Sequence, residues 1–191
     1  MKKNTKILTI VLIILAILIV YFIGTSNHFI TLEQEVDSQY SQIESTLQRR
    51  ADLIPNLVAT VKGYAKHEEE VFTEIAKARS NLSGSIQKGD LDEINQAYDS
   101  LNSAISRLLA ISENYPTLQA NGNFQSLQDE LAGTENRINV ARQQYNEKVK
   151  TYNTSIKRFP GNIVATLSGF ESKEYFKASE GAKDTPTVNF E

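Results

Sequence analysis

Residues 30–65 read ITLEQEVDSQYSQIESTLQRRADLIPNLVATVKGYA, and their apolar positions decide the fold. The apolar residues recur at alternating spacings of three and four, which keeps them on one face of an α-helix. The pattern continues to residue 82, with Glu68 as its one interruption. Its members are Leu32, Val36, Tyr40, Ile43, Leu47, Ala51, Ile54, Val58, Val61, Ala65, Phe72, Ile75 and Leu82. A single helix of about fifty residues is roughly 75 Å long, so we expect other helices to lie alongside it.

On the N-terminal side, Ile7–Ile23 is an uncharged apolar run preceded by Lys2, Lys3 and Lys6. As a helix it is roughly 25 Å long, which is at the short end of lengths that cross a bilayer. A cleaved signal peptide is the alternative, but its apolar region is usually about 7–15 residues long and ends in a small-residue cleavage motif. Residues 24–28, GTSNH, lack that motif, and a chain without cysteine cannot carry a lipoprotein anchor. The sequence therefore favours a retained membrane anchor.

The charges around this run predict its orientation. Three lysines precede it, whereas the first charged residues after it are Glu33, Glu35 and Asp37. Because positive charge stays on the cytosolic side, we expect the N-terminus in the cytosol and the remainder of the chain outside. The expected parts are a cytosolic stub at residues 1–6, a transmembrane anchor at 7–23, an extracytoplasmic helical bundle at 30–176 and a flexible tail at 177–191.

Turn residues divide the rest of the bundle. Asp90, with Glu93 three residues later, forms a capping box that predicts a helix from Leu91 to about Glu113, closed by Pro116. An apolar stripe from Phe124 to Phe159 predicts a third helix after this.

The two last helices are bounded by Asn and Pro-Gly signals. Asn123 is the expected cap of the third helix, which stops at Pro160-Gly161, and Asn162 is the expected cap of a shorter segment, Ile163–Phe176. Ile163, Leu167 and Phe170 would close one end of the bundle. Short connections imply antiparallel neighbours. The predicted fold is all-α: an elongated antiparallel helical bundle, with three long helices and a short C-terminal helix, on one N-terminal transmembrane helix.

Composition argues against several classes of function. The chain has 20 Lys and Arg against 23 Asp and Glu, and three of its lysines precede the apolar run, so the exported part is acidic. We therefore expect no nucleic acid partner. The two histidines lack metal-ligand spacing, and no phosphate-binding loop or serine-hydrolase motif is present. The predictions are no metal, no cofactor, no identified small-molecule substrate and no enzymatic activity.

An unusual segment surrounds Pro55, where Arg49, Arg50, Asp52 and Asn56 gather on an otherwise amphipathic helix. One interpretation is a recognition patch at a proline kink. The other is that Arg49 and Asp52, spaced i,i+3, pair with each other while Pro55 only bends the helix. Surface charge pairs at helical spacing are common, which favours the second interpretation.

A second pattern is the dipeptide Tyr145-Asn146, repeated seven residues later as Tyr152-Asn153. The heptad places both tyrosines on the core stripe and both asparagines beside it, so one neighbouring helix would meet both pairs. We interpret the repeat as packing specificity rather than a ligand site, because the tyrosines continue an apolar stripe.

Charged residues also flank the core positions of the third helix. Glu135 and Arg142 are seven residues apart, beside the stripe. Antiparallel packing would bring Glu135 against Arg49 or Arg50 in a partly desolvated ion pair, which is costly to break from one side.

The segment QRRADLIPNLV at residues 48–58, with Val61–Ala65 and His67-Glu68 after it, resembles the LemA family. Further matching motifs are Glu113–Pro116, Asn123-Phe124, Glu135–Ile138, Ala141-Arg142, Tyr145-Asn146, Tyr152-Asn153, Phe159-Pro160 and Gly169 to Phe176. The resemblance implies a single-pass bacterial membrane protein with a long antiparallel helical domain. It implies no established catalytic activity, cofactor or substrate. The expected location is the bacterial cytoplasmic membrane, with the bundle outside.

Two functions follow as hypotheses. The first is a membrane-anchored extracytoplasmic scaffold of the cell envelope that presents the segment from Arg49 to Val58, together with the tyrosine repeat, to another envelope protein or to a second copy. The alternative is an extracytoplasmic sensor bundle that acts through a separate signalling partner, because the six residues before the anchor are too few for an output domain.

Overall fold

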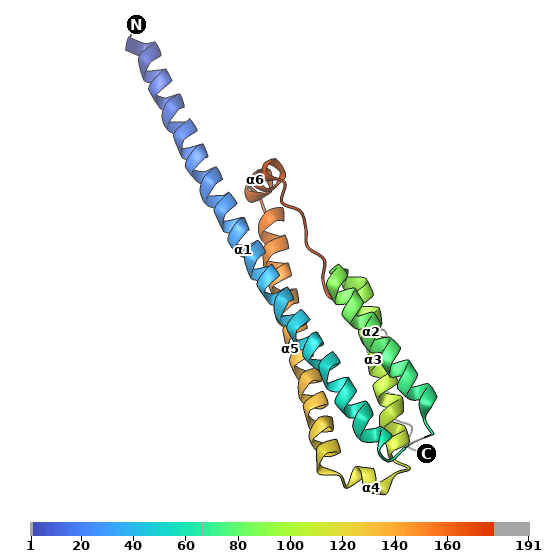
Figure 1. Ribbon diagram of the computed structural model, residues 1–191. Coiled ribbons are helices and arrows are strands. Elements are labelled where there is room, and N and C mark those ends of the chain that lie inside the picture. Colours follow the sequence, from blue (N-terminus) through green and yellow to red (C-terminus); the bar gives the residue numbers. More distant parts are fainter. Residues whose placement is uncertain (1, 66, 178–191) are drawn as a thin grey trace, which may run out of the picture. The chain divides into compact units, whose positions relative to one another are not determined.

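The computed structural model describes residues 2–65 and 67–177, and within them it contains helices and no strand (Figure 1). The helices are α1 (Lys2–Lys62), α2 (Glu69–Lys88), α3 (Leu91–Ser112), α4 (Pro116–Gln119), α5 (Gly122–Lys157) and α6 (Gly161–Ser168). The predicted all-α class is therefore confirmed. Met1 of the predicted cytosolic stub lies outside the described residues, as does the predicted flexible tail apart from Lys177.

The chain divides into two compact units, each made from segments distant in sequence. Unit 1 comprises residues 1–40 and 144–174, and unit 2 comprises residues 41–143 and 175–191. In unit 1, α1 lies along α5, with Lys148 Nζ 2.8 Å from Glu35 Oε2 (Figure 1). In unit 2, α2 and α3 form a helical hairpin joined at Gly89, which adopts a left-handed φ of 74° that favours glycine.

Helix α1 joins the apolar run to the bundle without interruption. It is the one helix of the described residues long and apolar enough to cross a membrane. Every large apolar side chain from Ile7 to Ile23 is exposed, by between 37% and 71% of its area. From Phe29 onward the same helix buries one stripe. A single helix thus changes from apolar on all sides to amphipathic across residues 24–28.

The apolar stripes form the core largely as predicted. In α1 the buried members are Leu32, Val36, Ile43, Leu47, Ala51, Ile54, Leu57 and Val61, and in α5 they are Phe124, Leu131, Ile138, Ala141, Tyr145, Val149, Tyr152 and Ile156. Leu57 takes the core position expected for Val58, which is half-buried. Phe159 is 76% exposed, so the predicted stripe ends before it.

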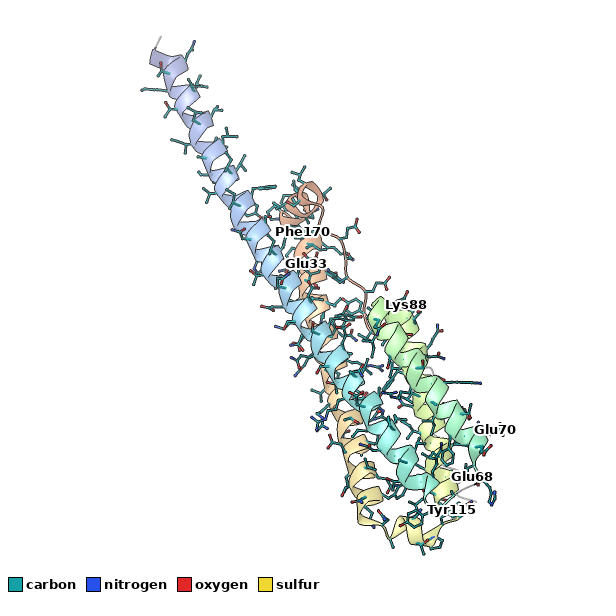
Figure 2. The ribbon with its side chains drawn as sticks, in the orientation of Figure 1. Glu33, Glu68, Glu70, Lys88, Tyr115 and Phe170 are labelled. Carbon is teal, nitrogen blue, oxygen red and sulfur yellow. The ribbon has the colours of Figure 1, made fainter. Side chains whose placement is uncertain are left out.

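The first predicted bundle helix is two helices, because the chain leaves the helical conformation at residues 63–65 and 67–68. Tyr64 N–H donates to Val61 O at 2.9 Å, which tightens the last turn of α1 just after Gly63. The acidic run from Glu68 to Glu70 then starts α2, where negative charge is favourable at a helix N-terminus. The Tyr115 hydroxyl lies 3.4 Å from Glu68 Oε1 at this turn (Figure 2).

The capping residues were partly predicted. Asp90 caps α3 as expected, since its Oδ1 accepts from Glu93 N–H at 2.9 Å. The cap of α5 is Asn121 rather than Asn123. Its Oδ1 accepts from the backbone N–H groups of Asn123 and Phe124 at 2.9 and 3.1 Å. Asn121 is the N-cap because its side chain reaches two backbone N–H groups of the first turn that have no helical partner.

The C-terminal helix is shorter than predicted. It ends at Ser168, and Gly169 follows with a φ of 76°, after which the chain has no helix to residue 177. Asn162 lies inside α6 and does not cap it. Ile163 and Leu167 are exposed, while Val164 and Ala165 are buried in their place.

Candidate functional site

The segment around Pro55 separates into a buried side and an exposed side. Arg50 is only 6% exposed, whereas Arg49, Asp52, Pro55 and Asn56 are all exposed. Spacings of three and four place these four residues along one side of α1. We call them the outer face of α1.

The ion pairs of the outer face differ from the predicted one. Arg49 does not pair with Asp52; its Nε donates to Glu130 Oε1 at 3.0 Å, and its NH2 lies 2.7 Å from the same oxygen. Asp52 instead accepts a hydrogen bond from Gln48 at 2.9 Å. Helical spacing puts Arg49 and Asp52 within reach of each other, but the Arg49 guanidinium pairs with the carboxylate of Glu130 on α5. Such exposed pairs contribute about 0–1 kcal/mol each.

Pro55 creates a hydrogen-bond acceptor inside unit 2. It has no backbone N–H, so the Ala51 carbonyl four residues earlier receives no helical hydrogen bond from it. Arg79 of α2 donates its Nε–H to this carbonyl at 2.9 Å, and its NH2 lies 3.7 Å from Asp52 Oδ1. Ala51 is fully buried. With any other residue at position 55, its backbone N–H would bond to the Ala51 carbonyl. Because Pro55 lacks this N–H, the carbonyl accepts from Arg79 instead, and this hydrogen bond links α1 to α2.

Arg50 is the centre of a buried polar cluster. Its NH1 lies 3.0 Å from Glu135 Oε2 and donates to the Leu131 carbonyl at 3.0 Å. Its NH2 donates to Asn102 Oδ1 at 2.9 Å. The predicted partly desolvated pair of Glu135 with an arginine of α1 is confirmed, and the partner is Arg50. Three helices, α1, α3 and α5, supply these groups.

Tyr98 completes the cluster and was missed as a functional side chain by the sequence analysis. Its hydroxyl donates to Glu135 Oε2, and its ring lies 5.7 Å from the Arg50 guanidinium. Burial raises the pKa of the Tyr98 hydroxyl to about 12. The available signal was its place on the α3 stripe, because a tyrosine at a core position needs a partner for its hydroxyl.

Arg142 packs its guanidinium between two aromatic rings in unit 2. It lies 4.4 Å from the Tyr98 ring centre and 5.3 Å from that of Phe176. Burial lowers the pKa of this guanidinium. Within the described residues its Nε and NH2 atoms make no hydrogen bond, and the contacts with the two rings are cation–π interactions.

The Tyr-Asn repeat contacts a neighbouring helix, as predicted, and also an extended segment. The Tyr145 ring centre lies 6.1 Å from that of Tyr40 on α1. Asn153 binds the backbone of Lys173 twice: its Nδ2 donates to the carbonyl and its Oδ1 accepts from the N–H, both at 2.9 Å. The Tyr145 hydroxyl donates to the Glu174 carbonyl at 3.1 Å. Tyr152 is fully buried and Asn146 is half-buried.

The same extended segment is also held by α1 within unit 1. Lys173 Nζ lies 2.8 Å from Glu33 Oε1. The Phe170 ring packs edge-on against Phe29, with ring centres 5.4 Å apart. Figure 2 shows Phe170 and Glu33 in this region. The Tyr145 hydroxyl and the Asn153 amide thus bond within the chain, whereas the buried Tyr152 hydroxyl makes no hydrogen bond with the described residues.

The chemistry of these clusters is that of intramolecular contacts. Among residues 2–65 and 67–177, no group of three or more His, Cys, Asp or Glu side chains is placed to hold a metal ion. Glu135 is engaged by both Arg50 and Tyr98. The arrangement neutralises buried charge, and the outer face of α1 stays exposed.

Comparison with known proteins shows a match over most of the bundle. The family described as the LemA family matches residues 39–190. Magnetosome protein MamQ 2 of Paramagnetospirillum magneticum is 28% identical over 207 residues, covering 93% of this chain and 75% of that protein. Protein LemA of Metamycoplasma hominis is 28% identical over 178 residues, covering 92% of this chain and 80% of that protein.

The first prediction concerns the Ala51 carbonyl. Arg79→Met should lower the free energy of unfolding by about 1–3 kcal/mol, because it leaves a buried acceptor without a partner. In a Pro55→Ala background the new N–H can donate to Ala51, so the same Arg79→Met change should cost less. Urea denaturation of the full chain in mild detergent, followed by circular dichroism, measures both. Arg137→Met, which removes an exposed pair with Glu130, is the matched control. An equal loss in the two backgrounds would disprove the link to the proline.

The second prediction concerns the buried ion pair. Glu135→Ala should cost about 3 kcal/mol, the low end of the range for breaking a buried pair, since the Glu135 side chain is 35% exposed. The cost arises from the uncompensated charge of Arg50, so adding Arg50→Met should recover part of it. A double-mutant cycle on the same unfolding measurement gives the coupling energy. Coupling below a few tenths of a kcal/mol would mean that the charges are independently solvated.

Proposed function

Because the chain belongs to the LemA family, we propose that it is a membrane-anchored scaffold of the bacterial cell envelope that acts by binding another protein and performs no catalysis. The proposed partner is another envelope protein or a second copy of this chain. The N-terminal lysines and the apolar run form the anchor, and the helical units are the exported part.

The observation that carries the proposal is the continuity of α1. Its residues Ile7–Ile23 leave all their large apolar side chains uncovered by the rest of the described chain. Exposing such a surface to water costs about 25 cal/mol per Å², so the run needs an apolar surrounding. A lipid bilayer supplies one, and the uninterrupted helix then joins the bilayer directly to the bundle.

The outer face of α1 is the proposed binding surface. Arg49 has 62% of its side-chain area exposed, although it pairs with Glu130. Asn56 and Pro55 are exposed beside it, so the face offers a cation, an amide and a rigid apolar ring to a partner. Arg50 and the repeat tyrosines are buried and act from inside, by fixing the surface that the partner meets. The proposed binding surface is therefore smaller than the one expected from the sequence, which also included the tyrosine repeat.

The third prediction concerns orientation. The lysines before the run favour a cytosolic N-terminus. The chain has no cysteine, so Gln96→Cys on α3 and Thr5→Cys in the N-terminal stub give single reactive thiols. A membrane-impermeant maleimide added to intact spheroplasts should label Gln96→Cys and should label Thr5→Cys only after permeabilisation. The reverse pattern would place the bundle in the cytosol.

The fourth prediction tests the binding surface. A photo-crosslinking amino acid at Asn56 should give one discrete adduct in native membranes, with a second copy or with one envelope protein. The same amino acid at Gln96 on α3, also exposed, is the control and should give no such adduct. Arg49→Ala should weaken the Asn56 adduct without unfolding the protein, because its ion pair is exposed. Adducts of equal intensity at both sites, or none, would contradict the scaffold; an adduct with a transmembrane kinase or transducer would favour the sensor.

A further inference from the structure

Three large apolar side chains at the end of α5 and on the short helix α6 face away from the core of unit 1. Phe159 is 76% exposed, Ile163 is 52% exposed and Leu167 is 72% exposed. The inward positions of α6 are filled by Val164 and Ala165, which are buried. We call Phe159, Ile163 and Leu167 the apolar tip.

Two of the three residues of the apolar tip share one side of α6. Ile163 and Leu167 are four residues apart on α6, so their side chains lie on the same side of the helix. Phe159 precedes the helix in the turn that leads into it. Isolated apolar residues on a surface need no explanation, but three exposed ones within nine residues of the chain are a candidate contact surface.

The tip lies at the same level along α1 as the end of the apolar run. A shallow groove is lined by Tyr21, Gly24 and Thr25 from α1 and by Arg158 and Phe159 from the turn. Tyr21 belongs to the apolar run, which ends at Ile23. The turn is therefore beside the last residues of the proposed membrane span.

The packing of Gly161 fixes this level more closely. A Cβ on Gly161 would lie 3.1 Å from Phe29 Cζ, so the start of α6 is in close contact with Phe29 of α1. Phe29 is six residues beyond Ile23, or roughly 9 Å along a helix. The polar layer on each side of a bilayer is several Å thick, since the whole bilayer measures about 40–45 Å and its hydrocarbon core about 30 Å. This leaves about 5–8 Å of polar layer on each side, so the start of α6 falls at the outer edge of the lipid headgroups. The groove that the turn shares with Gly24 and Thr25 of α1 falls within them.

Two cations accompany the apolar tip. Lys157 and Arg158 are exposed at the end of α5, and neither makes an ion pair with another described residue. Long basic side chains at the membrane interface reach the headgroup phosphates while apolar neighbours enter the acyl region. The charge and the apolar surface are therefore both complementary to a lipid leaflet.

We propose that the apolar tip inserts into the boundary between headgroups and acyl chains, in the leaflet on the side of the bundle. This gives the protein a second membrane contact. The inference rests on the proposed membrane anchor. The occupant of the tip is the lipid itself, because the tip adjoins the span within one compact unit. The contact would hold unit 1 against the bilayer at two points, at the span and at α6.

The experiment places a fluorescent probe beside the tip in the full chain. Ser168→Cys is exposed and leaves Phe159, Ile163 and Leu167 intact. The labelled protein is reconstituted into vesicles of phosphatidylcholine and phosphatidylglycerol in equal amounts, which carry a nitroxide either near the headgroup or deep in the acyl chain. An apolar face at the interface sits about 5–10 Å into this boundary, so the shallow nitroxide should quench the Ser168 probe more than the deep one.

Two reference probes separate failure of this inference from failure of the anchor. A probe at Leu15→Cys, within the run, should be quenched more by the deep nitroxide, and a probe at Lys150→Cys, on the exposed side of α5, by neither. If Leu15 is quenched while Ser168 behaves like Lys150, the anchor stands and the tip does not insert. If Leu15 is not quenched by either lipid, the anchor itself fails.

A matched variant tests the side chains that carry the contact. Adding Ile163→Ser and Leu167→Ser to Ser168→Cys alters only exposed positions and should abolish the quenching by the shallow nitroxide, with the helical circular dichroism unchanged. Unaltered quenching would show that these side chains do not hold the probe in the lipid. A Ser168 probe shielded from added iodide yet unquenched by either lipid would mean that protein covers the tip, which would also overturn the proposal.

Discussion

The guanidinium of Arg50 is a full charge held almost entirely out of water, and unit 2 is arranged around its neutralisation. A guanidinium presents its N–H groups in fixed directions within one plane, so each partner must arrive at a set place. Glu135 and the Leu131 carbonyl come from α5, and Asn102 comes from α3. Two helices that meet only through apolar stripes can shift by one repeat of the stripe at a small cost in free energy, because the shift preserves the packed volume and the apolar pattern. The cluster removes that freedom, since a shifted helix would leave the charge unpaired.

Much of this could be predicted from the sequence, for physical reasons. The spacing of the stripes specifies helices, and Asp90 was a cap because three residues later Glu93 offers the N–H it needs. Glu135 was matched to an arginine of α1 because both flank core positions. The choice of Asn121 over Asn123, and of Glu130 over Asp52 as the partner of Arg49, depended on three-dimensional approach that periodicity does not contain.

The C-terminal segment shows where a pattern misleads. Ile163, Leu167 and Phe170 have helical spacing, yet Gly169 adopts a left-handed conformation and ends α6 before the pattern is complete. Apolar periodicity identifies one side of a helix but does not say what that side meets. Here the larger apolar residues, Ile163 and Leu167, face away from the core, and the smaller Val164 and Ala165 make the buried contact.

The double hydrogen bond between Asn153 and Lys173 has a consequence for how this part of the chain can vary. Both bonds go to main-chain atoms, so the amide of Asn153 recognises the path of the segment and is indifferent to the side chain that residue 173 carries. An aspartate at 153 would keep the acceptor and lose the donor, and a leucine would lose both. The backbone path of the extended segment is therefore fixed by the side chain of one residue on α5, and these two bonds place no requirement on the segment's own side chains.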